Sequence, residues 1–126
     1  MCQQLMNNTL AIRIAALLGF VAVALGAFGA HGLKEILTRN NTGAIWEKAV
    51  FYQFVHVIMM FVLATRTRLQ TGPWFCFLVG ILLFSGSLYV LALTNTRWWG
   101  AITPFGGVSF LVGWLWLAIC APKSAT

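Results

Sequence analysis

Charged residues divide the chain into four long uncharged runs. The ten Lys, Arg, Asp and Glu side chains lie outside residues 14–33, 49–65, 69–96 and 98–122, which hold 20, 17, 28 and 25 residues. A helix that crosses the hydrocarbon core of a bilayer needs about 20 apolar residues, within a range of about 17 to 25. The pattern therefore predicts one transmembrane domain over residues 1–126, with spans near 10–30, 49–65, 74–94 and 98–121.

The longest polar connection predicts a further element on the membrane surface. Within residues 31–48, Leu33, Ile36 and Leu37 stand at helical spacing, which is typical of a short amphipathic turn. The predicted fold class is thus all-α, an integral membrane four-helix bundle with short connections and one surface amphipathic turn. Because four spans alternate in direction, both chain ends should lie on the same side of the membrane.

Composition excludes several classes of protein. The hydrophobic set makes up 60% of the 126 residues and charged residues only 8%, which rules out a soluble domain, a disordered tail and a coiled coil. The net charge of +6 would suggest nucleic acid in a soluble chain. Here it indicates topology signals and contact with anionic lipid, so the predicted partner is the lipid bilayer and not nucleic acid. Cys2, Cys76 and Cys120 show no spacing typical of a disulfide framework or a metal site.

The first span admits two interpretations. Arg13 followed by an apolar stretch and small residues resembles a cleavable leader. The stretch is longer than the apolar core of a usual leader, however, and its small residues recur four apart, as in closely packed membrane helices. We therefore favour a retained helix. The residues predicted to pack helices together, in spans one and four, are Gly19, Gly26, Gly29 and Gly113.

The Lys and Arg residues are divided almost evenly between the two sides of the membrane, so their number alone does not set the orientation of the protein. Arg13, Arg66, Arg68 and Lys123 lie on the side of the chain ends, whereas Lys34, Arg39, Lys48 and Arg97 lie on the other side. The tight turn that contains Arg66 and Arg68 is the strongest local signal. By the positive-inside rule it favours cytoplasmic ends.

The polar residues of the spans gather in the leaflet away from the chain ends. Tyr52, Gln53 and His56 fall within an arc of about 100° on one helix face, and such a face is expected to look into the bundle. The residues that we predict to line a polar pocket in this leaflet are His31, Tyr52, Gln53, His56, Ser85, Ser87, Tyr89 and Thr103.

This cluster has a structural interpretation and a functional one. The side chains could hydrogen-bond one another and hold the helices in register, which is the interpretation that we favour. Alternatively they could bind a ligand or an ion. Ligation of haem or a metal by the two histidines lacks an attachment motif, so we predict no cofactor and no metal.

Span four contains a predicted break. Pro104 removes a backbone donor, and Gly106 with Gly107 loosens the helix further, so we expect a kink or an unwound turn. The break could open onto the polar leaflet, as broken helices do in transporters, or serve only packing.

No catalytic motif is present. Asp is absent, Glu35 and Glu47 lie in the surface connection, and neither G-x-S-x-G, H-E-x-x-H nor G-x-G-x-x-G occurs. We predict that the protein is not an enzyme. We predict that it acts as an accessory or interaction protein of the membrane, as a homo-oligomer or within a larger complex. A carrier or channel for a small polar molecule or a proton is the alternative.

Four blocks carry a resemblance to a known family. They are LGAFGAH at 25–31, YQFVH at 52–56, LFSGSLYVLAL at 83–93 and TPFGGVSFLVGW at 103–114. In order and spacing they resemble the family that contains bacterial YgdD and eukaryotic transmembrane protein 256 (UPF0382, domain of unknown function 423). The resemblance implies a multi-pass protein of the bacterial inner membrane with four spans and no assigned activity. It also implies that the predicted pocket and the break at Pro104, Gly106 and Gly107 fall on family-typical positions.

Overall fold

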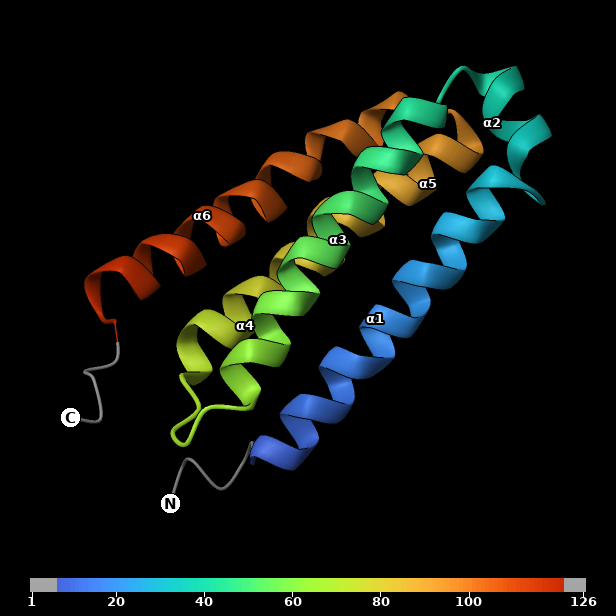
Figure 1. Cartoon of the computed structure of the whole chain (residues 1–126). Helices are drawn as coiled ribbons and strands as arrows, with labels where there is room; N and C mark the ends of the chain where they lie inside the picture. The colour runs from blue at the N-terminus through green and yellow to red at the C-terminus, as the bar shows by residue number, and fades with distance from the viewer. Residues whose placement is uncertain (1–6, 122–126) are drawn as a thin grey trace.

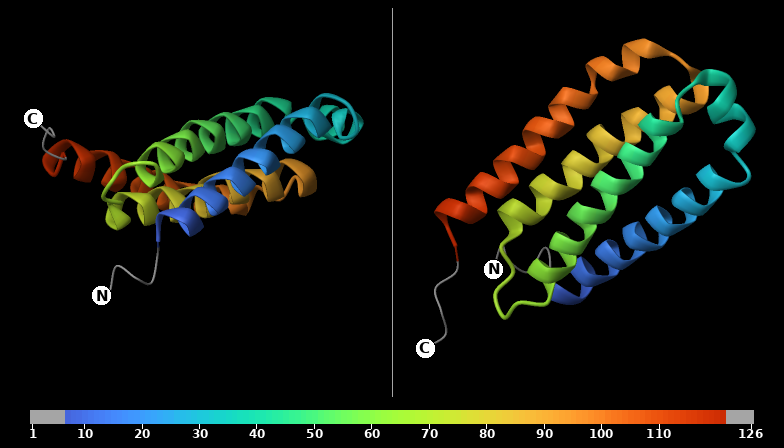
Figure 2. Two further views of the ribbon diagram at one scale, coloured as in Figure 1. Left: turned by 60° about the horizontal axis from the view of Figure 1, so that its bottom comes forward. Right: turned by 45° about the horizontal axis from the view of Figure 1, so that its top comes forward.

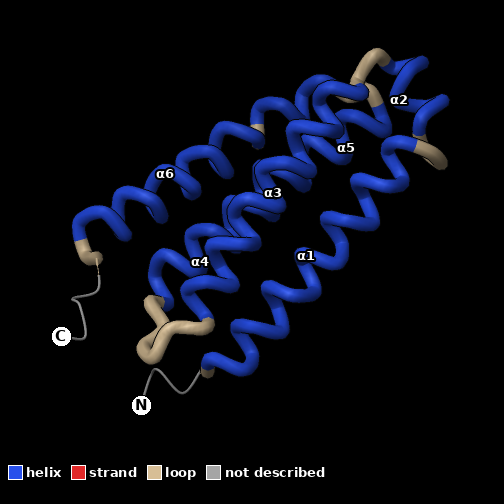
Figure 3. The backbone as a smooth tube through the Cα atoms, in the orientation of Figure 1, coloured by secondary structure: helices blue, strands red, loops and turns tan. Residues whose placement is uncertain are grey.

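A computed structural model describes residues 7–121, and this part of the chain is built from helices without strands. In chain order these are α1 (Asn8–Ala30), α2 (Lys34–Asn40), α3 (Gly43–Ala64), α4 (Thr71–Gly80), a π-helical turn (Ile81–Ser85), α5 (Gly86–Thr94), a 3₁₀ turn (Arg97–Ala101) and α6 (Thr103–Ile119) (Figure 1). The connections between them are short (Figure 3). Cys2 and Lys123, which entered the predictions, lie outside the described residues.

Four of these segments are long and apolar enough to cross a membrane. They are Asn8–Ala30, Gly43–Ala64, Thr71–Thr94 and Arg97–Ile119, with 23, 22, 24 and 23 residues. The third joins α4, the π-helical turn and α5 in one continuous span, and the fourth joins the 3₁₀ turn to α6. The all-α fold with four spanning helices is thereby confirmed.

The second span begins six residues before its predicted start, at Gly43 instead of residue 49. Asn41 adopts a left-handed conformation with φ of 56°, which ends α2 and allows the chain to turn directly into α3. The predicted span began only at residue 49 because Glu47 and Lys48 are charged. In the structure both side chains are exposed on the first turns of the helix, so they do not interrupt it.

The helices form an open arrangement around α3. Helix α3 packs against α1 on one side and against α4 and α5 on the other, and α6 packs against α4 and the π-helical turn. Helices α1 and α6 lie at opposite edges of the molecule (Figures 1 and 2). The start of α1 and the end of α6 lie at one end of the molecule and α2 lies at the other, as expected of four spans that alternate in direction (Figure 1).

Small residues allow close packing within the chain. Gly19 lies against Val57, with 3.4 Å between its ideal Cβ position and Cγ1 of the valine. Gly26 lies in the same way against Val50 at 3.5 Å. A Cβ added at Gly29 would meet the indole of Trp46, and a Cβ added at Gly113 would lie 2.6 Å from Cε1 of Phe77. The predicted packing glycines of spans one and four therefore face neighbouring helices of the same molecule.

Side-chain amides tie the helix ends together. Asn8 donates from Nδ2 to the carbonyl oxygens of Ala64 and Arg66, at 2.8 Å each, so the start of α1 is bound to the end of α3. Gln70 donates to the carbonyl oxygen of Cys120 at 2.9 Å, which binds the start of α4 to the end of α6. These bonds satisfy carbonyls that helix ends leave without a partner.

Candidate functional site

The predicted pocket residues occupy several separate hydrogen-bonded groups. His31, exposed at the end of α1, and the side chain of Tyr52, exposed on α3, join none of them. The others lie on α3, the π-helical turn, α5 and the start of α6. Most of their polar side-chain atoms form a hydrogen bond to a neighbouring helix or to a backbone carbonyl.

Gln53 and Tyr89 link three helices. Gln53 is only 2% exposed and donates from Nε2 to the carbonyl oxygen of Leu18 on α1 at 2.9 Å. Its Oε1 accepts a hydrogen bond of 2.6 Å from the Tyr89 hydroxyl on α5. The indole of Trp46 packs on the ring of Tyr89 with 4.8 Å between ring centroids, and its N–H donates to the carbonyl oxygen of Leu25 at 2.9 Å. This group joins α1, α3 and α5.

We expect Tyr89→Phe to lower the stability of the protein modestly. The change removes the hydroxyl that donates to Gln53, and hydrogen bonds between membrane helices contribute about 0.6 kcal/mol on average. Thermal unfolding in detergent measures the loss. Tyr52→Phe is the matched control, because the Tyr52 hydroxyl has no hydrogen-bond partner among residues 7–121. Equal destabilisation by both changes would contradict the assigned bond.

Both ring nitrogens of His56 form hydrogen bonds. Its Nε2 accepts a hydrogen bond of 2.9 Å from the indole N–H of Trp114 on α6, and its Nδ1 lies 2.8 Å from the carbonyl oxygen of Tyr52. Because an indole nitrogen only donates and a carbonyl oxygen only accepts, these partners assign the neutral tautomer with hydrogen on Nδ1. The ring also stacks on Phe110 with centroids 3.6 Å apart and planes at 9°. Both ring nitrogens of His56 are thus engaged within the protein.

The serines and Thr103 bind locally. Ser85, fully buried at the end of the π-helical turn, donates to the carbonyl oxygen of Ala49 on α3 at 2.7 Å. The hydroxyls of Ser87 and Thr103 lie 2.6 Å apart and join α5 to the start of α6. Within residues 7–121 no three His, Cys, Asp or Glu side chains lie close enough to hold a metal ion.

The π-helical turn has no counterpart in the predictions. It places one extra residue per turn in the middle of span three, and it brings the backbone of Phe84 against Gly106 of α6. Such turns are rare and occur often at functional sites. An apolar run gives no periodicity signal for one inserted residue, and only Gly80 and Gly86 mark its two ends in the sequence.

The break predicted in span four requires correction. Pro104 lies in the first turn of α6, where a missing N–H is tolerated, and the helix continues through Gly106 and Gly107 without an unwound turn. The change of helix type lies before the proline, where the 3₁₀ turn gives way to α6. Gly106 serves contact with span three instead of loosening the helix.

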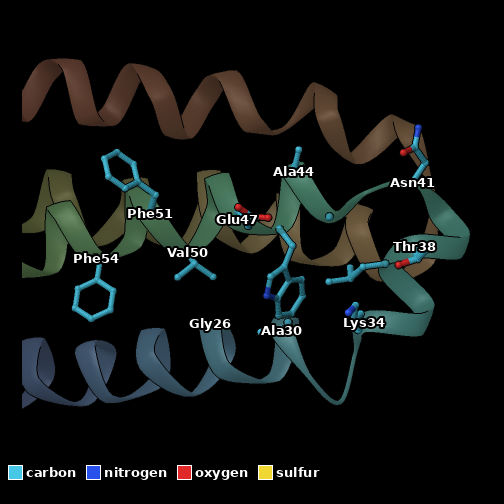
Figure 4. A pocket seen from close by; sticks show the side chains of 14 residues that line it. Gly26, Ala30, Lys34, Thr38, Asn41, Ala44, Glu47, Val50, Phe51 and Phe54 are labelled. Carbon is cyan, nitrogen blue, oxygen red and sulfur yellow. The ribbon is translucent and has the colours of Figure 1, made fainter.

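A groove of about 870 Å³ lies between the end of α1, α2 and the first half of α3 (Figure 4). None of the eight predicted pocket residues lines it. Its lining includes Gly26, Lys34, Trp46, Glu47, Val50 and Phe54. The sequence analysis assigned Lys34 and Glu47 to the surface connection, and no motif in the sequence marks either of them as part of a site.

Comparisons with known proteins agree with this architecture. The sequence profile of a family described as "Protein of unknown function (DUF423)" matches residues 25–107. A UPF0382 membrane protein of Staphylococcus epidermidis is 46% identical over 119 residues, which cover 90% of this chain and 96% of the relative. The UPF0382 inner membrane protein YgdD of Escherichia coli K12 is 41% identical over 121 residues, 92% of each chain. No solved structure matches significantly. This chain therefore belongs to the UPF0382 (DUF423) family of membrane proteins.

Proposed function

We propose that this protein acts without catalysis as an accessory or interaction protein of the membrane. The observation that supports the proposal is the internal pairing of the polar side chains in its spans. His56 is bonded to Trp114, and Gln53 to Tyr89, across helices. A side chain engaged in such a bond stabilises helix packing, and a solute would have to displace that bond in order to bind.

The edge helix α6 offers a surface for a partner helix. Its outward face exposes large apolar side chains at helical spacing, namely Phe105, Val108, Leu111, Leu115 and Ile119. The opposite face of α6 is already used, since it packs on α4 and the π-helical turn. Either a second copy of the chain or another membrane protein would fit this role.

Site-specific photo-crosslinking in native membranes tests the proposal. A photoreactive phenylalanine analogue at Leu111 of α6 should give a discrete protein adduct, identified by mass spectrometry. The same analogue at Ile58, an exposed position on the central helix α3, is the control and should give mainly lipid adducts. Lipid adducts alone at both positions, together with a monomer in native mass spectra, would overturn the proposal.

A carrier or channel for a small polar molecule or a proton remains the alternative function. The observation that favours it is that Tyr52, Gln53 and His56 lie close together along α3 in one leaflet. Measurements of flux in vesicles distinguish the two functions, and the variant that does so best is His56→Ala.

A further inference from the structure

The groove between α1, α2 and α3 is about as long as one leaflet of a bilayer is thick. Ala44 and Phe54 both line it, and these residues are ten positions apart on α3, about 15 Å at the rise of an α-helix. That length is half of a hydrocarbon core of about 30 Å. Because the second span begins at Gly43, a groove of this length that starts beside α2 would reach from the lipid headgroups to near the middle of the membrane.

The deep part of the groove is apolar. Figure 4 shows Val50 and Phe54 pointing from α3 toward α1, where Gly26 lines the same groove without a side chain. The indole N–H of Trp46, the one polar group of that side chain, is already bonded to the carbonyl oxygen of Leu25. An occupant of this part needs apolar surface and no hydrogen-bonding groups, as in an acyl chain.

The shallow part carries one charge of each sign. Lys34 of α2 and Glu47 of α3 both line the groove and both are exposed. Within the described part of the chain neither side chain forms an ion pair. Thr38 and Asn41 line the same part and add hydrogen-bonding groups. The headgroup that complements this rim has an anionic group and a cationic group on one molecule.

We propose that the groove binds a phospholipid with a primary amine in its headgroup, that is, phosphatidylethanolamine. One acyl chain lies along Val50 and Phe54, the phosphate lies at the Lys34 ammonium, and the lipid ammonium donates to the Glu47 carboxylate. Phosphatidylcholine fits less well because its quaternary ammonium has no N–H to donate. Phosphatidylglycerol fits less well because it brings no cation to Glu47. The site is independent of the interaction role proposed above, since it uses neither α6 nor His56.

Native mass spectrometry of the full chain tests the site. The protein is exchanged into detergent with phosphatidylethanolamine, phosphatidylcholine and phosphatidylglycerol at equal concentrations, and the retained lipid is counted. We expect phosphatidylethanolamine to be retained about fivefold over each of the others, the scale of a partly exposed charge pair. Glu47→Gln should remove the preference over phosphatidylcholine, and Lys34→Gln should lower retention of all three lipids.

Matched variants separate the site from general charge. Glu35→Gln and Arg39→Gln make the same changes of charge on exposed residues of α2 that do not line the groove, and they should leave retention unchanged. Gly26→Leu, checked for folding by thermal unfolding, should fill the apolar part and lower retention of every lipid. Equal losses in Glu35→Gln and Glu47→Gln would overturn the proposal. It would also be overturned by stronger retention of phosphatidylglycerol than of phosphatidylethanolamine.

Discussion

Gly106→Ala is expected to destabilise the protein strongly. A Cβ added at this buried glycine would meet the backbone nitrogen of Phe84 and would lie 2.7 Å from its Cα. A backbone cannot rotate away as a side chain can, so α6 would have to move from the π-helical turn. Overpacking of this kind typically costs about 1 to 3 kcal/mol, and we expect the upper part of that range.

Gly107→Ala is the matched control for this prediction. At Gly107 the nearest atom to an added Cβ is Cδ2 of Phe84, at 3.9 Å, which is ordinary van der Waals contact. Because alanine favours the helix over glycine by about 1 kcal/mol, this change should be neutral or stabilising. Thermal unfolding of the two variants in the same detergent compares them. Similar unfolding temperatures for both variants would contradict the close contact between α6 and span three.

Much of the fold follows from the sequence because a membrane imposes simple rules on length and polarity. The uncharged runs around α1, α4 to α5 and α6 locate three spans to within a few residues. Small residues at intervals of four on α1 indicate close packing, and Ala15 and Ala22 are indeed fully buried. The grouping of polar residues by leaflet follows in turn, because antiparallel spans fix which ends of the helices lie together.

The partners of each polar side chain do not follow from the same rules. Gln53 and Ser85 bind backbone carbonyls on other helices, and every residue supplies such a carbonyl. The partner of His56 is Trp114, a residue to which the sequence assigned no role. Hydropathy predicts that a polar side chain needs a partner, but it does not predict which groups the helix rotation brings within reach.

The π-helical turn in span three could not be predicted from the sequence for a related reason. The π-helical turn places the backbone of Phe84 in close contact with Gly106, which is far from it in the sequence. The glycine pair at 106 and 107 suggested loosening because glycine lowers helix propensity. In the structure Gly106 has no side chain and therefore allows α6 to approach span three closely. Whether a glycine loosens a helix or allows such an approach depends on the helix that lies beside it.

His56→Ala is expected to give the second large loss of stability. The change removes a ring that is only 4% exposed and that stacks on Phe110, and it leaves the N–H of Trp114 without its acceptor. Loss of one partner of a buried hydrogen bond costs about 1 to 3 kcal/mol, and the cavity adds to this. We expect about 3 kcal/mol in all, measured by thermal unfolding in detergent. His31→Ala, at an exposed position, is the control and should change little.

The same variant separates the interaction protein from the carrier or channel. If His56 serves packing, vesicles that contain the wild-type protein or His56→Ala should show equal background flux of protons and small polar solutes. His56→Gln should then recover part of the lost stability, because a glutamine carbonyl can accept from the Trp114 N–H although glutamine does not titrate. Proton flux above that of empty vesicles in the wild type, lost in both variants while His56→Gln keeps its stability, would instead establish the transport function.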